Sequence, residues 1–302
     1  MHNDYHIPVL LTEVIDGLKI KENGIYVDCT FGGGGHSRAI LEKLGKEGRL
    51  IAFDQDEDAK GNLPEDERVL FIPHNFRHTR RFLQLHGIKE IDGLLADLGV
   101  SSHQFDEGSR GFSTRFEGAM DMRMDQRAAK TAFQVVANYP EGELHKLFEQ
   151  YGEVSNSKTL ARTIVDIRRN VSLETITGFK NGVSGVVKGN PAKYFAQVFQ
   201  ALRIEVNDEL GALKELLEQL PGLLKIGGRA AFITFHSLED RLVKVFFKEG
   251  TFERVEDHPF QTAVKLKSLK PITKKPIEAS EEERKRNPRS RSAKLRVAER
   301  IG

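Results

Sequence analysis

Residues Ile25–Ser37 read IYVDCTFGGGGHS, and residues Leu50–Asp54 read LIAFD. This order predicts a strand, a glycine turn, a helix and a second strand that ends at an acidic residue. The four consecutive glycines, Gly32–Gly35, remove every Cβ where the backbone must turn, so amide groups can approach a ligand closely. Asp54 would then accept hydrogen bonds from a ribose diol. The stretch predicts a site for an adenosine-bearing cofactor.

The details of the glycine turn separate two classes of cofactor. The dinucleotide pattern G-x-G-x-x-G needs a third glycine, but counting from Gly32 puts Ser37 there and counting from Gly33 puts Arg38 there. A nicotinamide cofactor is therefore disfavoured. Asp28, at the end of the first strand, suits a cofactor with a cationic amino-acid end and no diphosphate, which favours S-adenosylmethionine.

Length and composition limit the class of protein. A chain of 302 residues has room for one large domain or two. Its single cysteine, Cys29, excludes a disulfide within the chain and indicates a reducing setting, which predicts a cytoplasmic protein. No apolar run approaches the roughly 18 residues that cross a membrane, and the N-terminus has no leader pattern, so neither membrane spanning nor secretion is expected.

Further strands are predicted from short apolar runs. They lie at Val69–Ile72, at Asp92–Ala96 directly before Asp97, and at Arg229–Phe235 after a Gly-Gly turn. Near-continuous apolar runs suit a buried parallel sheet, and helices fit between them. The alternation predicts a doubly wound, Rossmann-like α/β sheet with ligand groups at the carboxyl ends of its strands.

The alternation is interrupted in the middle of the chain. Between residues 106 and 199 apolar residues recur at helical spacing, as Leu160 and Ile164 do, and no convincing strand pattern appears. We therefore expect an inserted all-helical domain there. The cofactor domain would be discontinuous, comprising residues 1–105 and 200–302.

The basic charge of the chain is concentrated near its C-terminus. Between Lys265 and Arg300 there are 13 Lys and Arg against 5 Glu, although the whole chain carries only +2. We expect a basic tail from about residue 265. Such a tail can neutralise phosphates and release counterions, or it can be a disordered, solvated segment, and composition alone leaves both readings open.

Eight motifs along the chain can be compared with a known family. They are HIPVLL (His6–Leu11), TFGGGGHS (Thr30–Ser37), DLGVSS (Asp97–Ser102), RGFS (Arg110–Ser113), DMRMD (Asp121–Asp125), FQALRIEVNDEL (Phe199–Leu210), FHSLEDR (Phe235–Arg241) and NPRSRSAKLRVAER (Asn287–Arg300). In this order they closely resemble the bacterial 16S ribosomal RNA cytosine-N4 methyltransferase family (RsmH, also called MraW). The resemblance covers nearly the whole chain.

The resemblance implies a class I methyltransferase domain that uses S-adenosylmethionine to methylate the exocyclic N4 of one cytidine in the decoding centre. Its partner would be 16S rRNA within the small ribosomal subunit, and a homodimer stays open. The cofactor contacts that the resemblance implies are Gly34, Gly35, His36, Asp54, Phe76, Asp97 and Gln104. His36 has a second reading, as a cap of the helix that starts there.

Asp97 also has two candidate roles. The N4 lone pair of cytosine is delocalised into the ring, so the amine needs hydrogen-bond acceptors before it can attack a methyl group. Asp97 is the candidate catalytic acceptor, but a commitment to the cofactor is equally open. In-line transfer requires no metal, and Asp121 and Asp125 are expected in salt bridges.

RNA contacts are expected in the insert, on the polar side of the helix after Pro191, at the strand end before His236 and in the basic tail. The candidates are Arg110, Arg115, Arg123, Arg203, Asn207, His236, Arg241, Arg289, Arg291 and Lys294. Two other functions stay open. One is a ribosome-assembly factor that binds RNA and keeps a vestigial cofactor site, and the other is a nicotinamide-dependent oxidoreductase.

Overall fold

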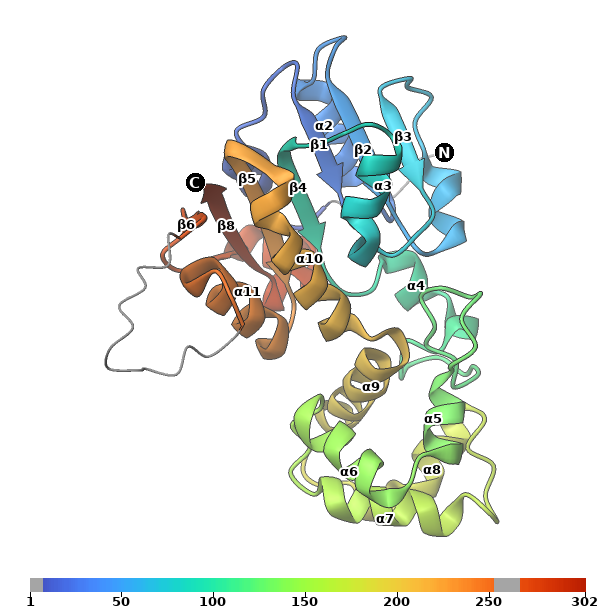
Figure 1. Cartoon of the computed structure of the whole chain (residues 1–302). Coiled ribbons are helices and arrows are strands. Elements are labelled where there is room, and N and C mark those ends of the chain that lie inside the picture. Colours follow the sequence, from blue (N-terminus) through green and yellow to red (C-terminus); the bar gives the residue numbers. More distant parts are fainter. Residues whose placement is uncertain (1–7, 253–266) are drawn as a thin grey trace, which may run out of the picture. The chain divides into compact units, whose positions relative to one another are not determined.

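The computed structural model of the chain describes residues 8–252 and 267–302. His6 and Lys265, which open two of the sequence features above, lie outside the described residues. The chain forms two compact units (Figure 1). Unit 1 comprises Met1–Gly99 and Gly211–Gly302, and unit 2 comprises Val100–Leu210.

Unit 1 is built on a mixed β-sheet. Its strands are β1 (Ile25–Asp28), β2 (Arg49–Phe53), β3 (Val69–Ile72), β4 (Ile91–Asp97), β5 (Leu224–Thr234), β6 (Leu269–Pro271), β7 (Ile277–Glu278) and β8 (Lys294–Arg300). The strand order is β3-β2-β1-β4-β5-β8-β6, and β7 also pairs with β8. Strands β1 to β5 are parallel, whereas β8 runs antiparallel to β5. The order reverses between β1 and β4, which is where doubly wound sheets bind their ligands.

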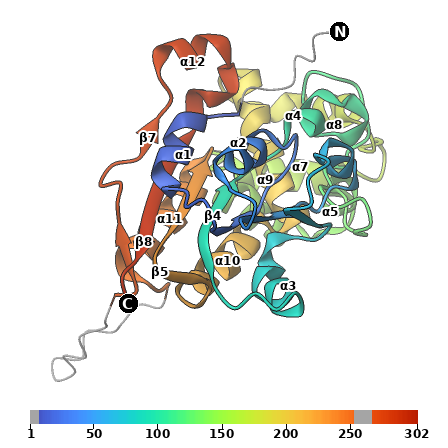
Figure 2. The same ribbon diagram turned by 90° about the horizontal axis from the view of Figure 1, so that it is seen from above.

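Helices cover both faces of this sheet. Figure 2 shows α1 (Leu11–Leu18) and α2 (Gly35–Lys43) on one side, and α3 (Thr79–Leu85) and α10 (Glu209–Leu223) on the other. Alternate residues of β5 therefore enter different apolar clusters, Ala230 and Phe232 on the α10 side and Ala231 and Ile233 on the α1 side. Because both faces are buried, the strand reads as a continuous apolar run, and the predicted doubly wound α/β fold is confirmed.

The basic C-terminal segment is folded into unit 1. After β6 and β7 come α12 (Glu281–Arg286), the 3₁₀ helix η5 (Pro288–Ser292) and β8, while α11 (Ser237–Glu249) precedes them in the chain. Strand β8 lies between β5 and β6, and its Leu295 and Val297 are fully buried. For residues 267–302 the reading as a disordered, solvated tail is therefore wrong, because this segment supplies an interior strand.

Unit 2 is helical. Its helices are α4 (Ser102–Asp106), α5 (Ala132–Asn138), α6 (Glu141–Gln150), α7 (Ser157–Ile167), α8 (Ile176–Gly182) and α9 (Pro191–Asn207), with the short 3₁₀ turns η3 (Gly108–Arg110) and η4 (Ser184–Val186). Helix α9 starts sharply because the Asn190 side chain accepts a hydrogen bond from Lys193 N and Pro191 occupies the first turn. Its Val198 and Leu202 enter one core with Leu144 and Leu160.

The boundaries of the units differ from the expected ones at residues 105 and 199. Both expected boundaries lie inside unit 2, which spans Val100–Leu210. The reason is that α9 belongs to the helical core along its whole length, as its buried Val206 shows. A pattern of apolar residues marks a helix but does not tell which neighbour buries it. Within the residues that the structure describes, no helix has the length and apolar character needed to cross a membrane.

Two short 3₁₀ helices follow the first strands of unit 1. They are η1 (Glu57–Asn62) and η2 (Phe76–His78). Each is capped by the side chain of the residue before it, Asp56 for η1 and Asn75 for η2. Since both follow the carboxyl end of a parallel strand, they help to form the edge of the sheet at which ligands are expected.

Candidate active site

The glycine turn between β1 and α2 needs its glycines for reasons inside the protein. Gly32 and Gly34 have φ angles of 50° and 72°, a region that side chains with a Cβ disfavour. A Cβ on Gly34 would lie 2.8 Å from the Phe31 ring, and a Cβ on Gly35 would lie 2.3 Å from Cγ of Pro8. The N-terminal segment thus packs directly on the turn, which the sequence did not predict.

Asp54 holds the glycine turn from the end of the neighbouring strand. Its Oδ2 accepts a hydrogen bond from Gly32 N at 2.7 Å, and its Oδ1 accepts one from Asp56 N at 2.9 Å. Burial raises the pKa of Asp54 to about 6, although these two hydrogen bonds act to lower it. An ionised carboxylate has about four lone-pair positions, so one on each oxygen remains for a ligand.

Asp28 has a structural role that differs from the expected one. Its side chain is only 1% exposed, its Oδ2 accepts a hydrogen bond from Ser37 Oγ at 2.7 Å, and its Oδ1 accepts one from Thr30 N at 3.0 Å. Burial raises the pKa of this carboxyl as well. The expectation that Asp28 faces the cationic end of a cofactor is wrong, because the carboxylate ties the strand to the first turn of α2.

Asp97 lies at the end of β4, one strand away from the glycine turn. Its backbone N donates a hydrogen bond to Thr30 Oγ1 at 2.7 Å, and its Oδ2 lies 3.6 Å from Nδ1 of His36. The other carboxylate oxygen, Oδ1, is buried and has no hydrogen-bond partner among the described residues. Burial raises the pKa of Asp97 to about 6, and the nearby His36 acts to lower it.

His36 does not cap helix α2. The cap residue is Gly34, which makes no side-chain cap bond, and His36 is the second residue of the helix. Its Nε2 lies 3.0 Å from the carbonyl oxygen of Val9, in the N-terminal segment. The ring therefore connects that segment to Asp97, and the reading as a helix cap is wrong.

Phe76 and Gln104 complete the set of implied cofactor contacts. Phe76 opens η2 just beyond the carboxyl end of β3 and is half-buried against the α10 side of the core. Gln104 belongs to unit 2, where it forms a capping box with Ser101: each side chain bonds the backbone N–H of the other residue. The sheet edge of unit 1 thus brings together Gly34, Gly35, His36, Asp54, Phe76 and Asp97.

Most RNA candidates in unit 2 hold their own unit together. Arg110 is buried and donates to the carbonyl oxygen of Arg123 at 3.0 Å, while Asn207 accepts from Met124 N at 2.8 Å. Arg203 pairs with Glu209 at 2.8 Å. Arg115 is exposed. These four side chains therefore differ in how accessible they are to a ligand.

The acidic pair in the DMRMD motif behaves as expected. Asp121 pairs with Arg123 at 2.7 Å, and Asp125 pairs with Arg127 at 2.8 Å. The neighbouring arginine lowers the pKa of Asp121 against the opposing effect of burial. The prediction of salt bridges is confirmed.

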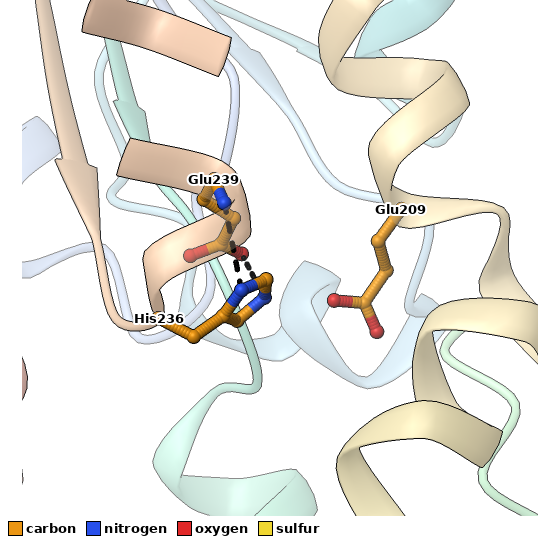
Figure 3. A group of neighbouring side chains, drawn as sticks. All are labelled: Glu209, His236 and Glu239. Carbon is orange, nitrogen blue, oxygen red and sulfur yellow. Dashed lines mark hydrogen bonds and ion pairs between the residues drawn. The ribbon is translucent and has the colours of Figure 1, made fainter. Parts of the chain in front are cut away.

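The strand end at His236 carries a compact polar group. His236 caps α11, and its Nε2 lies 3.2 Å from Oε1 of Glu239, whose Oε2 accepts from Phe235 N at 2.8 Å (Figure 3). Glu239 is 2% exposed. Glu209, also labelled in Figure 3, belongs to unit 2 and pairs there with Arg203. The His236 ring is thereby fixed at the carboxyl end of β5.

The C-terminal candidates lie on either side of the start of β8. Arg291 is exposed, Arg289 and Lys294 are half-buried, and Arg241 is exposed on α11. Arg296, which the sequence did not single out, is buried and pairs with Asp240 at 2.7 Å. In the sequence this charged residue stands between apolar Leu295 and Val297, and that alternation was the signal for a strand.

Sequence reasoning also missed residues that organise the site. Thr30 bonds both Asp28 and Asp97 N, and Pro8 and Val9 contact the turn and the His36 ring. In the sequence only their place in the motifs HIPVLL and TFGGGGHS pointed to them. A hydroxyl or carbonyl group in a loop follows no repeating pattern from which its role could be predicted.

A glycine turn beside an acidic strand end, on a doubly wound sheet, defines the class of Rossmann-like cofactor-binding enzymes. The model of the MraW methylase family matches residues 3–301, so this chain belongs to that family. A protein of Azobacteroides pseudotrichonymphae named ribosomal RNA small subunit methyltransferase H is 53% identical over 298 residues, 98% of each chain. One of the same name from Parabacteroides distasonis is 51% identical over 299 residues, again 98% of each chain.

A solved structure shows a weaker likeness. It is a putative rRNA-methylase from Clostridium thermocellum, aligned over 98% of this chain and 100% of its own. The identity is 14% and the TM-score is 0.45.

Proposed function

We propose that this chain transfers a methyl group from S-adenosylmethionine to the exocyclic N4 of a cytidine in 16S rRNA. Membership of a methylase family and relatives named for ribosomal RNA of the small subunit support this reaction. The observation that carries it is the buried Oδ1 of Asp97, which has no hydrogen-bond partner within residues 8–252 and 267–302. This oxygen lies on the edge that also holds the glycine turn and Asp54. A ribosomal substrate would place the enzyme in the cytoplasm.

The residues of the site fit this cofactor. Asp54 uses one lone pair of each oxygen for backbone N–H groups, which leaves one on each oxygen for the two hydroxyls of a ribose. The Gly34 N–H already donates to the Phe31 carbonyl at 2.7 Å, so Gly34 would allow close backbone approach, while the Gly35 amide and His36 would hold the amino-acid end. Phe76 would cover the adenine. When bound, S-adenosylmethionine supplies an electrophilic methyl group on a sulfonium. Gln104, which lies outside the eight motifs and belongs to unit 2, stays a contact that the resemblance implies.

Asp97 would make the target amine nucleophilic. An acceptor that draws on a proton of N4 localises the nitrogen lone pair, and a carboxylate does this best when it is ionised. With its pKa raised to about 6, Asp97 is mostly ionised above pH 7 and still close enough to neutrality to take up a proton. Positioning of amine and methyl group then accounts for the remaining acceleration, with no need for a metal or a second copy of the chain.

RNA would be held by basic and polar groups of both units. Arg115, Arg241, Arg291 and Lys294 support this role best, since each is exposed or half-buried. For the other candidates, Arg110, Arg123, Arg203, Asn207, His236 and Arg289, binding RNA would mean sharing or exchanging the contacts that they make within the protein. The target cytidine would leave its stack to reach the methyl group.

The reaction is tested with small ribosomal subunits from a strain that lacks this activity. The protein is incubated with methyl-labelled S-adenosylmethionine, and the labelled nucleoside is identified after digestion of the RNA. Label in N4-methylcytidine is the expected result. Label in another nucleoside would keep the cofactor but overturn the substrate, and absence of label despite measured cofactor binding would favour an assembly factor.

A further inference from the structure

The peptide group that joins Val9 to Leu10 is held at both of its ends. Its carbonyl oxygen lies 3.0 Å from Nε2 of His36, and its N–H donates to Oε1 of Glu283 at 2.9 Å. Glu283 lies on α12, 273 residues further along the chain than Leu10. Helix α12 thus contacts the N-terminal segment at the point where that segment meets the His36 ring.

Glu283 makes this bond in place of a more local one. Residues Ser280–Glu283 read SEEE, and a serine three residues before a glutamate is the sequence pattern of a capping box. Ser280 Oγ accepts from Glu283 N at 3.1 Å, which forms one half of the box. In the other half the glutamate would bond the backbone N–H of the serine, but here its Oε1 accepts from Leu10 N. The Glu283 side chain therefore serves the N-terminal segment and not its own helix.

Leu10 has a backbone conformation that needs such a contact. Its φ is 54°, in the left-handed region, which is unfavourable for a residue with a Cβ. Its side chain is fully buried, and its carbonyl oxygen accepts from Val14 N at 2.9 Å. A rotation of the preceding peptide group would relieve φ without requiring either contact to break. That rotation would also turn the Val9 carbonyl away from His36, and the bond to Glu283 opposes it.

Charged groups surround both ends of this connection. Those that act on Asp97 come from three elements and are His36 of α2, Asp28 of β1 and Glu239 of α11. Those that line the cavity beside Glu283 are Glu13 of α1 and Glu282 and Arg286 of α12. The charge of Glu283 and the hydrogen bond that it accepts can be changed separately. An experiment can therefore distinguish an effect of position from an effect of charge.

We propose that Glu283 is a positioning residue for the active site: it holds the peptide group before Leu10 and, through that group, the His36 ring. The proposal rests on the proposed function, in which Asp97 is the acceptor for the target amine. A fixed Val9 carbonyl keeps the ring hydrogen on Nε2 and directs Nδ1 to Oδ2 of Asp97, at 3.6 Å. A reacting group keeps its productive geometry only when the groups behind it are fixed as well. Glu283 would supply that support from the C-terminal part of the chain.

The test uses variants that separate the bond from the charge. In Glu283→Gln the amide oxygen can still accept from Leu10 N, but the charge is lost. In Glu283→Asp the charge stays, but the shorter side chain draws the carboxylate back from Leu10. Glu283→Ala removes both, and Glu282→Ala, an exposed site in the same helical turn, is the control with equal charge change.

Three quantities are measured for each variant. The first is kcat with small ribosomal subunits between about pH 5.5 and 9. The second is the tautomer of His36, read by NMR from its labelled ring nitrogens and assigned with His36→Gln; this readout needs no turnover. The third is urea unfolding, which checks the fold.

Glu283→Ala and Glu283→Asp are expected to move the acid side of the kcat profile to higher pH by about half a pH unit, because a loosened His36 lowers the pKa of Asp97 less. The loss in kcat should then be about two- to threefold larger at pH 5.5 than at pH 8.5. Glu283→Gln and Glu282→Ala should keep the wild-type profile. In the His36→Gln background Glu283→Ala should add no further shift, since both act through one ring. The wild-type ring should carry its hydrogen on Nε2, and the Ala and Asp variants should show a mixture of tautomers.

Wild-type profiles in both Glu283→Ala and Glu283→Asp would overturn the proposal, and so would an equal shift in Glu282→Ala. It would also be overturned if the profile followed the charge, with Glu283→Gln shifted and Glu283→Asp in place. If Glu283→Ala does not fold, Glu283→Asp decides. Absence of methylation by the wild type would overturn the proposed function instead. The tautomer would then still decide about Glu283, and an unchanged His36 ring in Glu283→Asp would count against the proposal.

Discussion

Nδ1 of His36 lies 3.6 Å from Oδ2 of Asp97, while Nε2 of the same ring lies 3.0 Å from the carbonyl oxygen of Val9. A carbonyl can only accept, so Nε2 carries the hydrogen of that bond. The N-terminal segment thereby fixes the ring against one oxygen of Asp97 and leaves the other oxygen, Oδ1, without a protein partner in the described residues. His36 is in this sense a positioning residue for the carboxylate.

Replacement of His36 should move the pH dependence of the reaction. Burial raises the pKa of Asp97 and His36 acts to lower it, so His36→Gln should raise that pKa further. The acid side of the kcat profile should then shift to higher pH, with a larger loss at pH 6.5 than at pH 8.5. Kinetics between about pH 5.5 and 9 measure this, with His86→Gln, an exposed site after α3, as the control. A profile that stays in place would show that His36 does not act through Asp97.

Asp97→Asn should raise the relative stability of the fold at neutral pH while it lowers the activity. The folded-state pKa of Asp97, about 6, is above the ordinary value of 3.8, so the folded state binds the proton more tightly than the unfolded state. The contribution of Asp97 to the free energy of unfolding therefore falls as pH rises through the range from about 4 to about 6. Asparagine does not titrate. The free energy of unfolding of the variant, minus that of the wild type, should therefore be about 1 kcal/mol larger at pH 7.5 than at pH 5. This value allows for solvent screening, because the Asp97 side chain is partly exposed.

Urea unfolding at the two pH values measures this difference, and the same variant should lose at least about 100-fold in kcat. A relative stability that is the same at both pH values would mean that Asp97 is not held at a raised pKa. Full activity of the variant would exclude Asp97 as the acceptor for the amine.

The sheet could be predicted from sequence because its strands are short apolar runs at regular intervals. The glycine turn could be predicted because four glycines follow one another. Strand β8 was not predicted, since its charged residues drew attention to a tail. In the sequence, apolar Leu295 and Val297 flank the charged Arg296, an alternation typical of a strand. Asp28 was misread for a different reason. An acidic residue at a strand end can face a ligand or the helix that follows it. Only the folded structure shows that Asp28 accepts a hydrogen bond from Ser37 Oγ, at 2.7 Å, in the following helix. The role of Val9 depends on a carbonyl oxygen, which no side-chain pattern reveals.

Arg296→Ala should destabilise the fold strongly. The side chains of Arg296 and Asp240 are 8% and 15% exposed, so the variant would leave a largely buried carboxylate without its partner. The expected loss in the free energy of unfolding is about 3 kcal/mol. Arg284→Ala, which breaks the more exposed pair with Glu278, should cost less than about 0.5 kcal/mol. Urea unfolding compares them, and equal losses would argue against β8 being an interior strand.

Gly35→Ala should disturb the site through the N-terminal segment. The new Cβ would lie 2.3 Å from Cγ of Pro8, so the segment must move and the bond between Val9 and His36 would be lost. We expect a loss of about 1 to 3 kcal/mol in stability and weaker cofactor binding. Pro8→Gly in the same chain should restore both. Gly61→Ala is the control, since a Cβ there would have no heavy atom of the described residues within 4 Å apart from its chain neighbours. Failure of the rescue would mean that Gly35 is needed for another reason.

Asp54→Asn should weaken cofactor binding at neutral pH. It should also remove the pH dependence of cofactor affinity. The asparagine keeps one acceptor oxygen, but its NH2 group cannot accept, so one of the bonds from Gly32 N and Asp56 N is lost, and one ribose hydroxyl loses its acceptor. Calorimetry at pH 7.5 should show a Kd for S-adenosylmethionine at least about tenfold higher, or about 1.4 kcal/mol. Burial raises the pKa of Asp54 to about 6, so wild-type affinity should fall as pH drops below 6, whereas that of the variant should change little. Asp58→Asn on the exposed part of η1 is the control, and an unchanged Kd in Asp54→Asn would remove Asp54 from the cofactor site.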